Sequence, residues 1–559
     1  MSKKSQIYWL VCLALFCLNI GFLAGNRALM KFPKFKIFNF EQNKIDETLE
    51  VILKNYVDTI DIKHLTESVV GKIMRELDPH SFYIPASDVE TASEDLDISF
   101  GGIGISFMMV DDTVVVASII SGGPAEKAGI KQLDRIVTVD DSIIAGRNIN
   151  QSKMLRILRG PKNSKVMLGI RRGNAEELVQ FELTRGDIPN NTVDVSYKVD
   201  DQIGYIKITK FARSTYNDFL TAIAKLRQDG VTGFIIDLRE NSGGLLDLAY
   251  NMSNEFLSKG DMVVYLQGNS IQRTEFPSNG KGVCQAVPLV VLIDEKSGSA
   301  SEIFAGAIQD NDRGLIIGRR SFGKGLVQTK FELSDGSELW LTIARYYTPS
   351  GRCIQKDYEL GKVEEYSMDL QNRYYHGEYF TVDSIKMNDS LAYQTVGGRT
   401  VYGGGGIMPD IFIPDDTTGY TSYFDQIYYR TNILFQFTLD YSDNNHEKLK
   451  QFSSYQALYE YLKQQPLIDE LADYAASKGI RKRPTLMEIS KKPIETLLYA
   501  YIVRNFFDSD GYYPLILQDD PAMLKAIEVI QKDIWKPEIF NRYLESNKED
   551  KSLALEEII

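Results

Sequence analysis

The sequence predicts an α/β multidomain protein whose central region builds a mostly parallel sheet, with helical regions at both ends of the chain. Three observations lead to this fold class. The chain has 559 residues, which is more than one hydrophobic core ordinarily holds. Residues 201–414 alternate apolar strand-like runs with helical patterns. By contrast, residues 40–94 and the tail after residue 419 show mainly helical periodicity.

The composition restricts the functions that the chain can perform. A formal net charge of −13 argues against non-specific binding to nucleic acid. The four histidines and four cysteines are scattered without metal-ligand spacing, so we expect no metal site and no cofactor. Cys12 and Cys17 lie in an N-terminal apolar run, and the sequence leaves open whether Cys284 and Cys353 form a disulfide.

The first 30 residues have the pattern of a membrane anchor or signal segment. Two lysines precede an apolar run over residues 7–25, which is about the ~20 residues that span a bilayer. Phe22 and Leu23 occupy positions where a cleavage site requires small residues, so an uncleaved anchor is favoured over a cleaved signal peptide. This pattern predicts a cell-envelope protein, anchored in the inner (cytoplasmic) membrane, with its body on the periplasmic side.

Residues 31–95 are predicted to form a helical N-terminal region. Apolar residues recur at helical spacing in residues 45–54 and 65–77, and Asp78-Pro79 ends the second helix. A short helical pair buries little apolar surface, so we expect it to pack on the next domain or on a second chain.

Residues 96–186 consist of short β-rich runs separated by glycine. The segments GGIGISF, GGPAEKAGI and LDRIVTVD follow one another in an order that resembles a PDZ domain. A glycine loop can hold a peptide's terminal carboxylate with its backbone N–H groups, and the next strand offers an edge for an added strand. The alternative is that the glycines only form a hairpin turn. The predicted carboxylate-binding residues are Gly101, Gly102, Ile103, Gly104 and Ile105.

The central region is predicted to contain a series of strand–helix units. In such sheets, ligands bind in loops at the carboxyl ends of the strands. The predicted strands are 203–208, 233–238, 289–293 and 315–318, and the predicted helices are 218–227, 245–256 and 300–309.

Three of these loops carry chemically informative residues. Residues 237–246 end in a glycine pair, and residues 321–328 place Lys324 between two glycines. In the third loop, SGSASE, Ser299 and Glu302 match a helix-capping box, so this segment by itself favours a cap over a nucleophile. A serine nucleophile needs a base, and the only histidine of the α/β region, His376, stands in an unrelated context. A buried lysine with a lowered pKa can take its place.

Several segments between Leu77 and Asp410 together resemble the carboxy-terminal processing peptidases, which are tail-specific serine proteases. Each segment is weak evidence by itself, but their common order is a strong signal. The segments are LDPHSFY, the PDZ-like stretch, DLRENSGGLL, SGSASEIFAGAIQDN, GRRSFGKGLVQ, YYTPSGR and GGGGIMPD.

The resemblance implies a role for each matched position. Ser299 would be the nucleophile, Lys324 the general base and Gln328 the residue that orients the lysine. The N–H group of Ala300, with one from Gly243 or Gly244, would form the oxyanion hole. The protease core would span residues 187–415, and the PDZ domain would capture a substrate's C-terminus and could also act as a gate. Gly298 departs from the family, where serine or alanine is common.

The sequence therefore predicts a serine endopeptidase that cleaves exported proteins near their C-termini through an acyl-enzyme. Its expected partners are unfolded or tail-bearing protein substrates and the membrane, and homo-oligomerisation stays open. The first alternative is a catalytically silent PDZ-containing scaffold of the envelope, and the second is hydrolysis of a non-peptide acyl substrate. Residues 416–559 form a predicted helical region that carries no chemical motif and would serve docking, oligomerisation or shielding of the core.

Overall fold

The computed structural model describes residues 42–545, except 111, 121, 174 and 176. The chain divides into two compact units, with the boundary after Lys72. The predicted anchor over residues 1–30, with Cys12 and Cys17, lies outside the described residues. Within the described part of the chain, no helix is both long and apolar enough to cross a membrane.

The first unit contains the predicted helical pair. Helix α2 (Gln42–Asn55) is followed by α3 (Ile62–Arg75), which runs into the second unit. Between the two helices lies an apolar groove, to which α3 contributes Leu65 and Val69. On the outside of the pair, Val51 and Leu53 of α2 are exposed.

A six-stranded sheet forms the centre of the second unit. Its first pair of strands, β10 and β11, is antiparallel, and the four following pairs are parallel. The strands lie in the order β10 (Val193–Lys198), β11 (Ile203–Ile208), β12 (Gly233–Asp237), β15 (Leu289–Ile293), β16 (Leu315–Gly318) and β21 (Ile411–Phe412).

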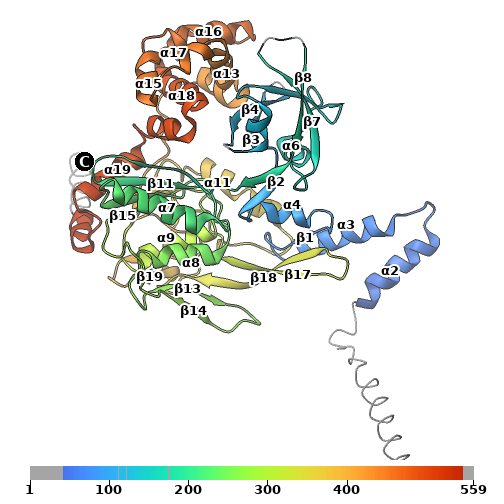
Figure 1. Ribbon diagram of the computed structural model, residues 1–559. Helices are drawn as coiled ribbons and strands as arrows, with labels where there is room; N and C mark the ends of the chain where they lie inside the picture. Colours follow the sequence, from blue (N-terminus) through green and yellow to red (C-terminus); the bar gives the residue numbers. More distant parts are fainter. Residues whose placement is uncertain (1–41, 111, 121, 174, 176, 546–559) are drawn as a thin grey trace, which may run out of the picture. The chain divides into compact units, whose positions relative to one another are not determined.

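Helices cover both faces of this sheet. Side chains alternate between the two faces along each strand, and the apolar side chains on each face pack against helices. Ile206, Ile236 and Val291 pack against helices on one face, which are α7 (Thr215–Gln228), α8 (Leu246–Asn254) and α9 (Ala300–Asp310). Tyr205 and Ile235 point to the other face. There α19 (Pro521–Gln531), near the end of the chain, packs on them (Figure 1).

This placement of α19 makes part of the tail a layer of the central α/β region. Ala526 and Val529 of α19 are fully buried against the sheet, so a core that ended at residue 415 would leave one sheet face uncovered. Shielding of the core was one of the functions expected for the tail, and α19 performs it.

A second, antiparallel sheet in this region was not predicted from the sequence. It brings the segment after α3 into the core, because Phe82 of β1 pairs with Trp340 of β18 and their rings stack. Its strands are β1 (Phe82–Ile84), β18 (Glu338–Tyr347), β13 (Met262–Gln267) and β14 (Thr274–Pro277), with β17 (Leu326–Glu332) paired to β18.

The region that resembles a PDZ domain has its own sheet and core. Its strands follow the order β3 (Ile105–Val110), β4 (Thr113–Ile119), β5 (Arg135–Val139), β7 (Lys165–Arg171) and β8 (Val179–Thr184), with β6 (Ser142–Ile143) paired to β5. Helices α5 (Pro124–Ala128) and α6 (Gln151–Leu158) complete the region, and β2 (Ser99–Gly102) pairs with β9 (Gly186–Pro189) where the chain enters and leaves.

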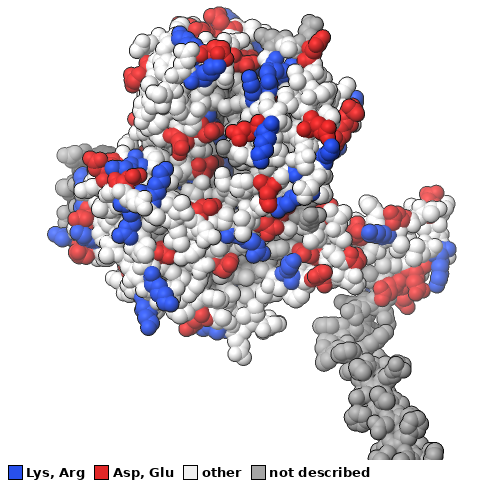
Figure 2. Space-filling view, in the orientation of Figure 1, with Lys and Arg blue, Asp and Glu red and all other residues white. Residues whose placement is uncertain are grey.

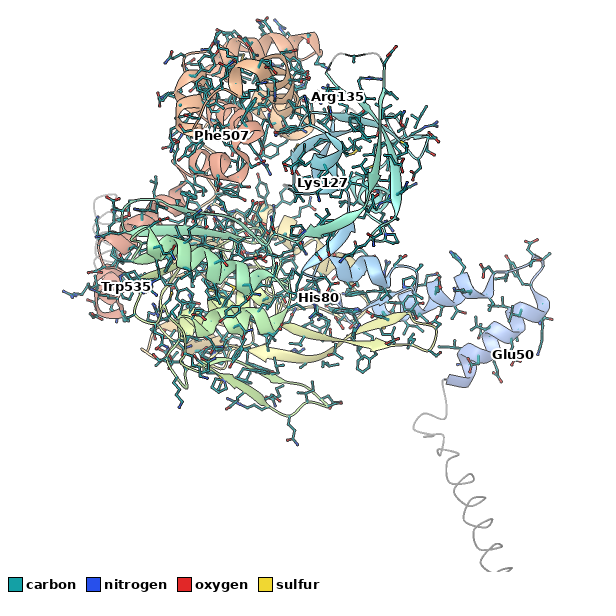
Figure 3. The ribbon with its side chains drawn as sticks, viewed as in Figure 1. Glu50, His80, Lys127, Arg135, Phe507 and Trp535 are labelled. Carbon is teal, nitrogen blue, oxygen red and sulfur yellow. The ribbon has the colours of Figure 1, made fainter. Side chains whose placement is uncertain are left out.

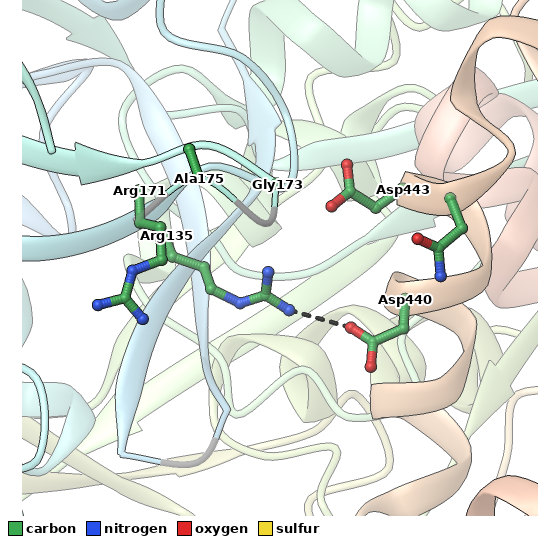
Figure 4. A pocket seen from close by; sticks show the side chains of 7 residues that line it. Arg135, Arg171, Gly173, Ala175, Asp440 and Asp443 are labelled. Carbon is green, nitrogen blue, oxygen red and sulfur yellow. Dashed lines mark hydrogen bonds and ion pairs between the residues drawn. The ribbon is translucent and has the colours of Figure 1, made fainter. Parts of the chain in front are cut away.

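Residues 422–516 form a helical bundle that contacts the PDZ-like region. Phe435 and Leu439 of α13 pack on Val110, Val115 and Leu133. Beside them, Arg135 of β5 forms an ion pair with Asp440 at 3.0 Å (Figure 4). The main helices are α13 (Ile433–Asn444), α15 (Tyr455–Leu462), α16 (Leu467–Ser477), α17 (Pro484–Ile489) and α18 (Lys491–Ile516), preceded by the short α12 (Ser422–Asp425).

The surface carries charges of both signs, and the two described cysteines are not bonded to each other. Acidic and basic side chains are interspersed on the face seen in Figure 2. Cys284 is buried and Cys353 is half-buried, and both are free thiols. The disulfide that the sequence left open is therefore not formed.

Candidate active site

The three serines of SGSASE occupy different environments at the start of α9. Ser297 and Ser301 are fully buried, and their hydroxyl groups donate to the carbonyl oxygens of Leu238 and Asn241 at 2.8 and 2.9 Å. Ser299 is half-buried, with φ at 53° and ψ at −113°. A non-glycine residue with positive φ is strained, and such strain is found at active sites. Ser299 is the serine of this segment that is placed for chemistry.

The carboxylate of Glu302 joins the serine segment to the lysine segment. Its Oε2 atom accepts hydrogen bonds from the backbone N–H groups of both Ser299 (2.8 Å) and Lys324 (2.9 Å). Its Oε1 atom accepts from the hydroxyl of Ser321 (2.5 Å) and the N–H of Gly323 (2.7 Å). Glu302 reaches back to Ser299 as a capping box predicts, but it also binds a loop that the sequence did not connect to it.

Glu302 is fully buried, and two effects act on its ionisation. Burial raises the pKa of its carboxyl group to about 7, while the four donors act in the opposite direction. All four partners donate, so the carboxylate is the form that satisfies every hydrogen bond.

Tyr346 of β18 makes a second bridge between the same two segments. Its hydroxyl lies within hydrogen-bond distance of the carbonyl oxygens of Ser299 (3.1 Å) and Lys324. The side chain is buried, and burial raises its pKa well above the usual value, so the hydroxyl stays protonated. Glu302 and Tyr346 together hold both backbone groups of each proposed dyad residue.

Lys324 has the environment expected of a lysine that acts as a base. Burial lowers the pKa of its ammonium group below the usual value, against the opposing effect of the carboxylates of Glu302 and Asp78. A lowered pKa increases the fraction of neutral amine at physiological pH. The lysine lies between β16 and β17, in the loop whose backbone Glu302 holds.

Gln328 lies in β17 and connects to the segment before β1. Its Nε2 atom donates to the hydroxyl of Thr342 (3.1 Å), and that hydroxyl donates to Asp78 (3.1 Å). Asp78 is therefore connected to Gln328 through Thr342, and its negative charge also acts on the pKa of Lys324. No hydrogen bond from Gln328 to Lys324 is present among the described residues, so the orienting role of Gln328 stays a prediction.

His80 lies near Lys324 and was not singled out from the sequence. It lies two residues before β1 and is labelled in Figure 3. Its Nε2 atom lies 2.8 Å from the hydroxyl of Tyr366. Burial, assisted by the positive charge of Lys324 and opposed by Asp78, lowers the pKa of His80 to about 4, so the ring is neutral at pH 7. The sequence signal for both residues is the segment LDPHSFY, which marks a helix end and contributes to the family resemblance but assigns no role to Asp78 or His80.

The glycine pair packs directly on the serine segment. A Cβ atom at Gly243, where φ is 107°, would lie 2.7 Å from the Cβ of Ser299 and 2.9 Å from the nitrogen of Ala300. No side chain fits there. At Gly244, where φ is 141°, a Cβ would lie 2.1 Å from the carbonyl oxygen of Phe211. Both positions therefore require glycine for close backbone approach.

The two glycines differ in what their N–H groups do. The N–H of Gly243 donates to Oδ1 of Asn241 at 2.9 Å. Within the described residues, no acceptor is recorded for the N–H of Gly244 or of Ala300, the first residue of α9. Of the three predicted oxyanion-hole residues, Gly244 and Ala300 thus retain donors for a ligand.

The predicted carboxylate-binding residues divide between a strand pair and a turn. Gly101 and Gly102 belong to β2 and pair with β9, while Ile103 and Gly104 connect β2 to β3. Ile105 begins β3, which lies at the edge of its sheet and pairs with β4 alone among the described strands. This edge is the surface at which a peptide strand could be added.

The described residues hold no group of three or more His, Cys, Asp or Glu side chains arranged for a metal ion. The chemical groups of the site are a strained serine, a half-buried lysine, two backbone donors and their supporting side chains. This set is suited to acyl transfer, because it offers a nucleophile, a base and donors for an oxyanion.

Comparisons with known proteins agree with this chemistry. Peptidase family S41 matches residues 202–363, a PDZ domain matches residues 101–183, and a family of unknown function matches residues 423–508. A carboxy-terminal-processing protease of Bartonella bacilliformis is 35% identical over 349 residues, which cover 60% of this chain and 80% of that protein.

Two further proteins are similar over a comparable length. The carboxy-terminal processing protease CtpA of Bacillus subtilis is 33% identical, over 60% of this chain and 71% of its own. The solved structure of a photosystem II D1 C-terminal processing protease is 30% identical, over 57% of this chain and 91% of its own, with a TM-score of 0.34.

Proposed function

We propose a mechanism for this chain, which belongs to peptidase family S41 and is a serine endopeptidase of the carboxy-terminal processing kind: Ser299 and Lys324 form its catalytic dyad. The observation that carries the proposal is the Oε2 atom of Glu302, which accepts hydrogen bonds from the backbone of both residues. Two segments that share one acceptor atom, and one tyrosine hydroxyl, are fixed next to each other.

The first half of the reaction forms the acyl-enzyme. The Oγ of Ser299 bonds to the scissile carbonyl carbon, and its proton passes to the neutral Nζ of Lys324. Lys324 then gives this proton to the leaving amine as the C–N bond breaks. The acyl group remains on Ser299, and the C-terminal fragment leaves as an amine.

Water completes the cycle by the same route. The water oxygen bonds to the acyl carbon while its proton passes to Lys324, and Lys324 returns a proton to Oγ as the ester bond breaks. Gln328 of β17 would orient Lys324, which lies two residues before this strand begins. Gln328 would also be connected to Asp78 through the hydroxyl group of Thr342.

The oxyanion formed in each half would be bound by the N–H groups of Gly244 and Ala300. Ala300 begins α9, where the unpaired N–H groups and the helix dipole favour negative charge. Because the N–H of Gly243 is bound to Asn241, we assign to Gly243 the role of close packing against Ser299. Removing one oxyanion-hole donor typically costs on the order of 10²–10³ in rate.

The PDZ domain would select the substrate. We propose that it spans residues 96–186, binds a free C-terminal carboxylate near residues 101–105, and adds the peptide to the edge of β3. The core of residues 187–415, completed by α19, would then cleave near that terminus. The N-terminal pattern supports an envelope protein with its body on the periplasmic side, acting on exported or unfolded proteins.

The test uses the full chain with an unfolded protein that ends in an apolar tail. Mass spectrometry of the products should show cleavage near the C-terminus, and amidation of the tail should raise KM. Ser299→Ala should abolish cleavage, while Ser301→Ala, which changes a neighbouring buried serine, should retain it. Equal cleavage by wild-type and Ser299→Ala protein would refute the assignment.

A further inference from the structure

Asp520 lies at the start of α19, far along the chain from the catalytic segments. Its Oδ1 atom accepts a hydrogen bond from the N–H of Met523 (2.7 Å), so it caps this helix. Both of its carboxylate oxygens also accept from one guanidinium nitrogen of Arg239, at 3.1 and 2.9 Å. A residue of the tail is thus bound to the loop that carries Gly243 and Gly244.

Arg239 is held between two carboxylates. On one side is Asp520, and on the other is Asp237, the last residue of β12, which Arg239 contacts at 2.7 Å and through its own backbone N–H at 2.8 Å. The side chain of Arg239 is only 18% exposed and that of Asp520 22%. In such a partly buried group, loss of one carboxylate leaves positive charge without its partner, since Lys207 also contacts Asp237.

The residues after Arg239 are held by hydrogen bonds within the loop and to Asp294 and Gly298. The N–H of Glu240, where φ is 61°, donates to the carboxylate of Asp294. The carbonyl oxygen of Asn241 accepts from the N–H of Gly298 at 3.0 Å. The side chain of Asn241 accepts from Gly243. These bonds restrain the later part of the loop, while Asp520, from beyond residue 415, anchors its start at Arg239.

We infer that Asp520 is a positioning residue of the peptidase: by holding Arg239, it fixes the glycine loop so that the N–H of Gly244 meets the oxyanion. This inference rests on the proposed function, because it needs Ser299 to attack and Gly244 to bind the oxygen. It extends the catalytic apparatus to the tail beyond residue 415. That tail carries no catalytic motif of its own.

The test compares Asp520→Asn with wild type in the full chain. The amide keeps the size and the capping oxygen but removes the charge that holds Arg239. We expect kcat to fall by about 10- to 100-fold, because an oxyanion donor is displaced but not removed. KM should stay within twofold, since the substrate contacts are unchanged. Asp520→Glu, which restores the charge, should recover part of the lost kcat.

A second readout separates positioning from a general loss of structure. A peptide aldehyde forms a tetrahedral adduct with the nucleophile, so its affinity depends on the oxyanion hole. Asp520→Asn should weaken aldehyde binding by about the same factor as kcat. Gln531→Ala is the matched control, because Gln531 ties the other end of α19 to Asp200 at 2.9 Å. It should leave kcat and aldehyde affinity unchanged.

The outcomes distinguish failure of the proposed Ser299–Lys324 dyad from failure of the role assigned to Asp520. If Ser299→Ala retains activity, the proposed function fails, whatever Asp520 does. If Ser299→Ala is inactive but Asp520→Asn keeps wild-type kcat and aldehyde affinity, the role of Asp520 is refuted and the dyad stands. An equal loss in Gln531→Ala and Asp520→Asn would also refute it, since α19 would then act only by stabilising the sheet.

Discussion

The catalytic loops and the PDZ domain are attached to the molecule in very different ways. The serine and lysine segments share buried partners, with four hydrogen bonds to Glu302 and the hydroxyl of Tyr346 between them. The PDZ domain meets the helical bundle through a small apolar contact and the ion pair of Arg135 and Asp440, whose side chains are 27% and 37% exposed. The serine and lysine segments are therefore held together by a buried network, whereas the contact between the PDZ domain and the bundle is small.

The largest effect is expected where the buried network is broken. Glu302→Gln replaces an acceptor of four hydrogen bonds with a group that also donates, so at least one buried donor loses its partner. We expect a loss of about 3 kcal/mol in the free energy of unfolding and a fall on the order of 10²-fold in kcat/KM. Denaturant unfolding and steady-state kinetics measure these two quantities.

The control for this change is Glu240→Gln in the glycine loop. Glu240 pairs with Lys296 at 2.8 Å, but both side chains are exposed. Exposed ion pairs contribute less than about 1 kcal/mol, so stability and activity should stay near wild type. Similar losses in both variants would show that the loop, and not the Glu302 network, is sensitive.

Two glycines beside Ser299 should respond differently to substitution by alanine. In Gly243→Ala, the new methyl group would lie 2.6 Å from the carbonyl oxygen of Gly298, so we expect a loss on the order of 10²-fold in kcat. In Gly298→Ala, the nearest atoms lie at 3.3 and 3.5 Å, so activity should change little. Gly298→Ala also tests whether the alanine that is common in the family is tolerated at residue 298. Equal losses of activity in both variants would contradict the expected difference between the two glycines.

The pH dependence of kcat/KM should identify the base. In the proposed mechanism the neutral form of Lys324 is the active one, so kcat/KM should rise with pH through the pKa of this lysine. The negative charge of Asp78 raises that pKa. Asp78→Asn removes the charge, so the pKa of Lys324 falls and the acid limb moves to lower pH.

A control for this shift is Glu332→Gln at the exposed end of β17, which should leave the acid limb in place. An acid limb that does not move in Asp78→Asn would mean that another group governs it. Glu302, with a pKa of about 7, would then be the first residue to consider.

The smallest effects are expected at the PDZ contact. Leu439 is 2% exposed against Val115 and Leu133, so Leu439→Ala should speed hydrogen exchange in β4 by on the order of 10-fold. Asp440→Ala removes the half-exposed ion pair with Arg135 and the hydrogen bond that the Tyr474 hydroxyl donates to Asp440 (2.7 Å), and should change exchange by a few-fold at most. Unchanged exchange in Leu439→Ala would show that the bundle does not hold the PDZ domain.

Much of the active site could be predicted because its parts are local. A strand end, a glycine pair and a helix start each leave a short pattern, and the loops after β12, β15 and β16 meet because parallel strands end at one edge of the sheet. The structure brings the segments of Ser299 and Lys324 together as this pattern indicates. The chemical roles of the two residues stay predictions.

The missed features all depend on contacts between distant parts of the chain. The antiparallel sheet joins β1 to β18, and Tyr346 reaches back to Ser299. Asp78 and His80 precede the whole PDZ domain in sequence, while Asp520 follows Arg239 by 281 positions. A single charged or aromatic residue has no periodic pattern, so nothing local indicates its distant partner.

The most direct test of the account is labelling with a fluorophosphonate, which phosphonylates an activated serine with loss of fluoride. Peptide mapping should place the adduct on Ser299, with a labelling rate that rises with pH. In Lys324→Ala, the rate should fall on the order of 10²-fold or more, because the base is absent. An adduct on another residue, or wild-type labelling in Lys324→Ala, would contradict the dyad.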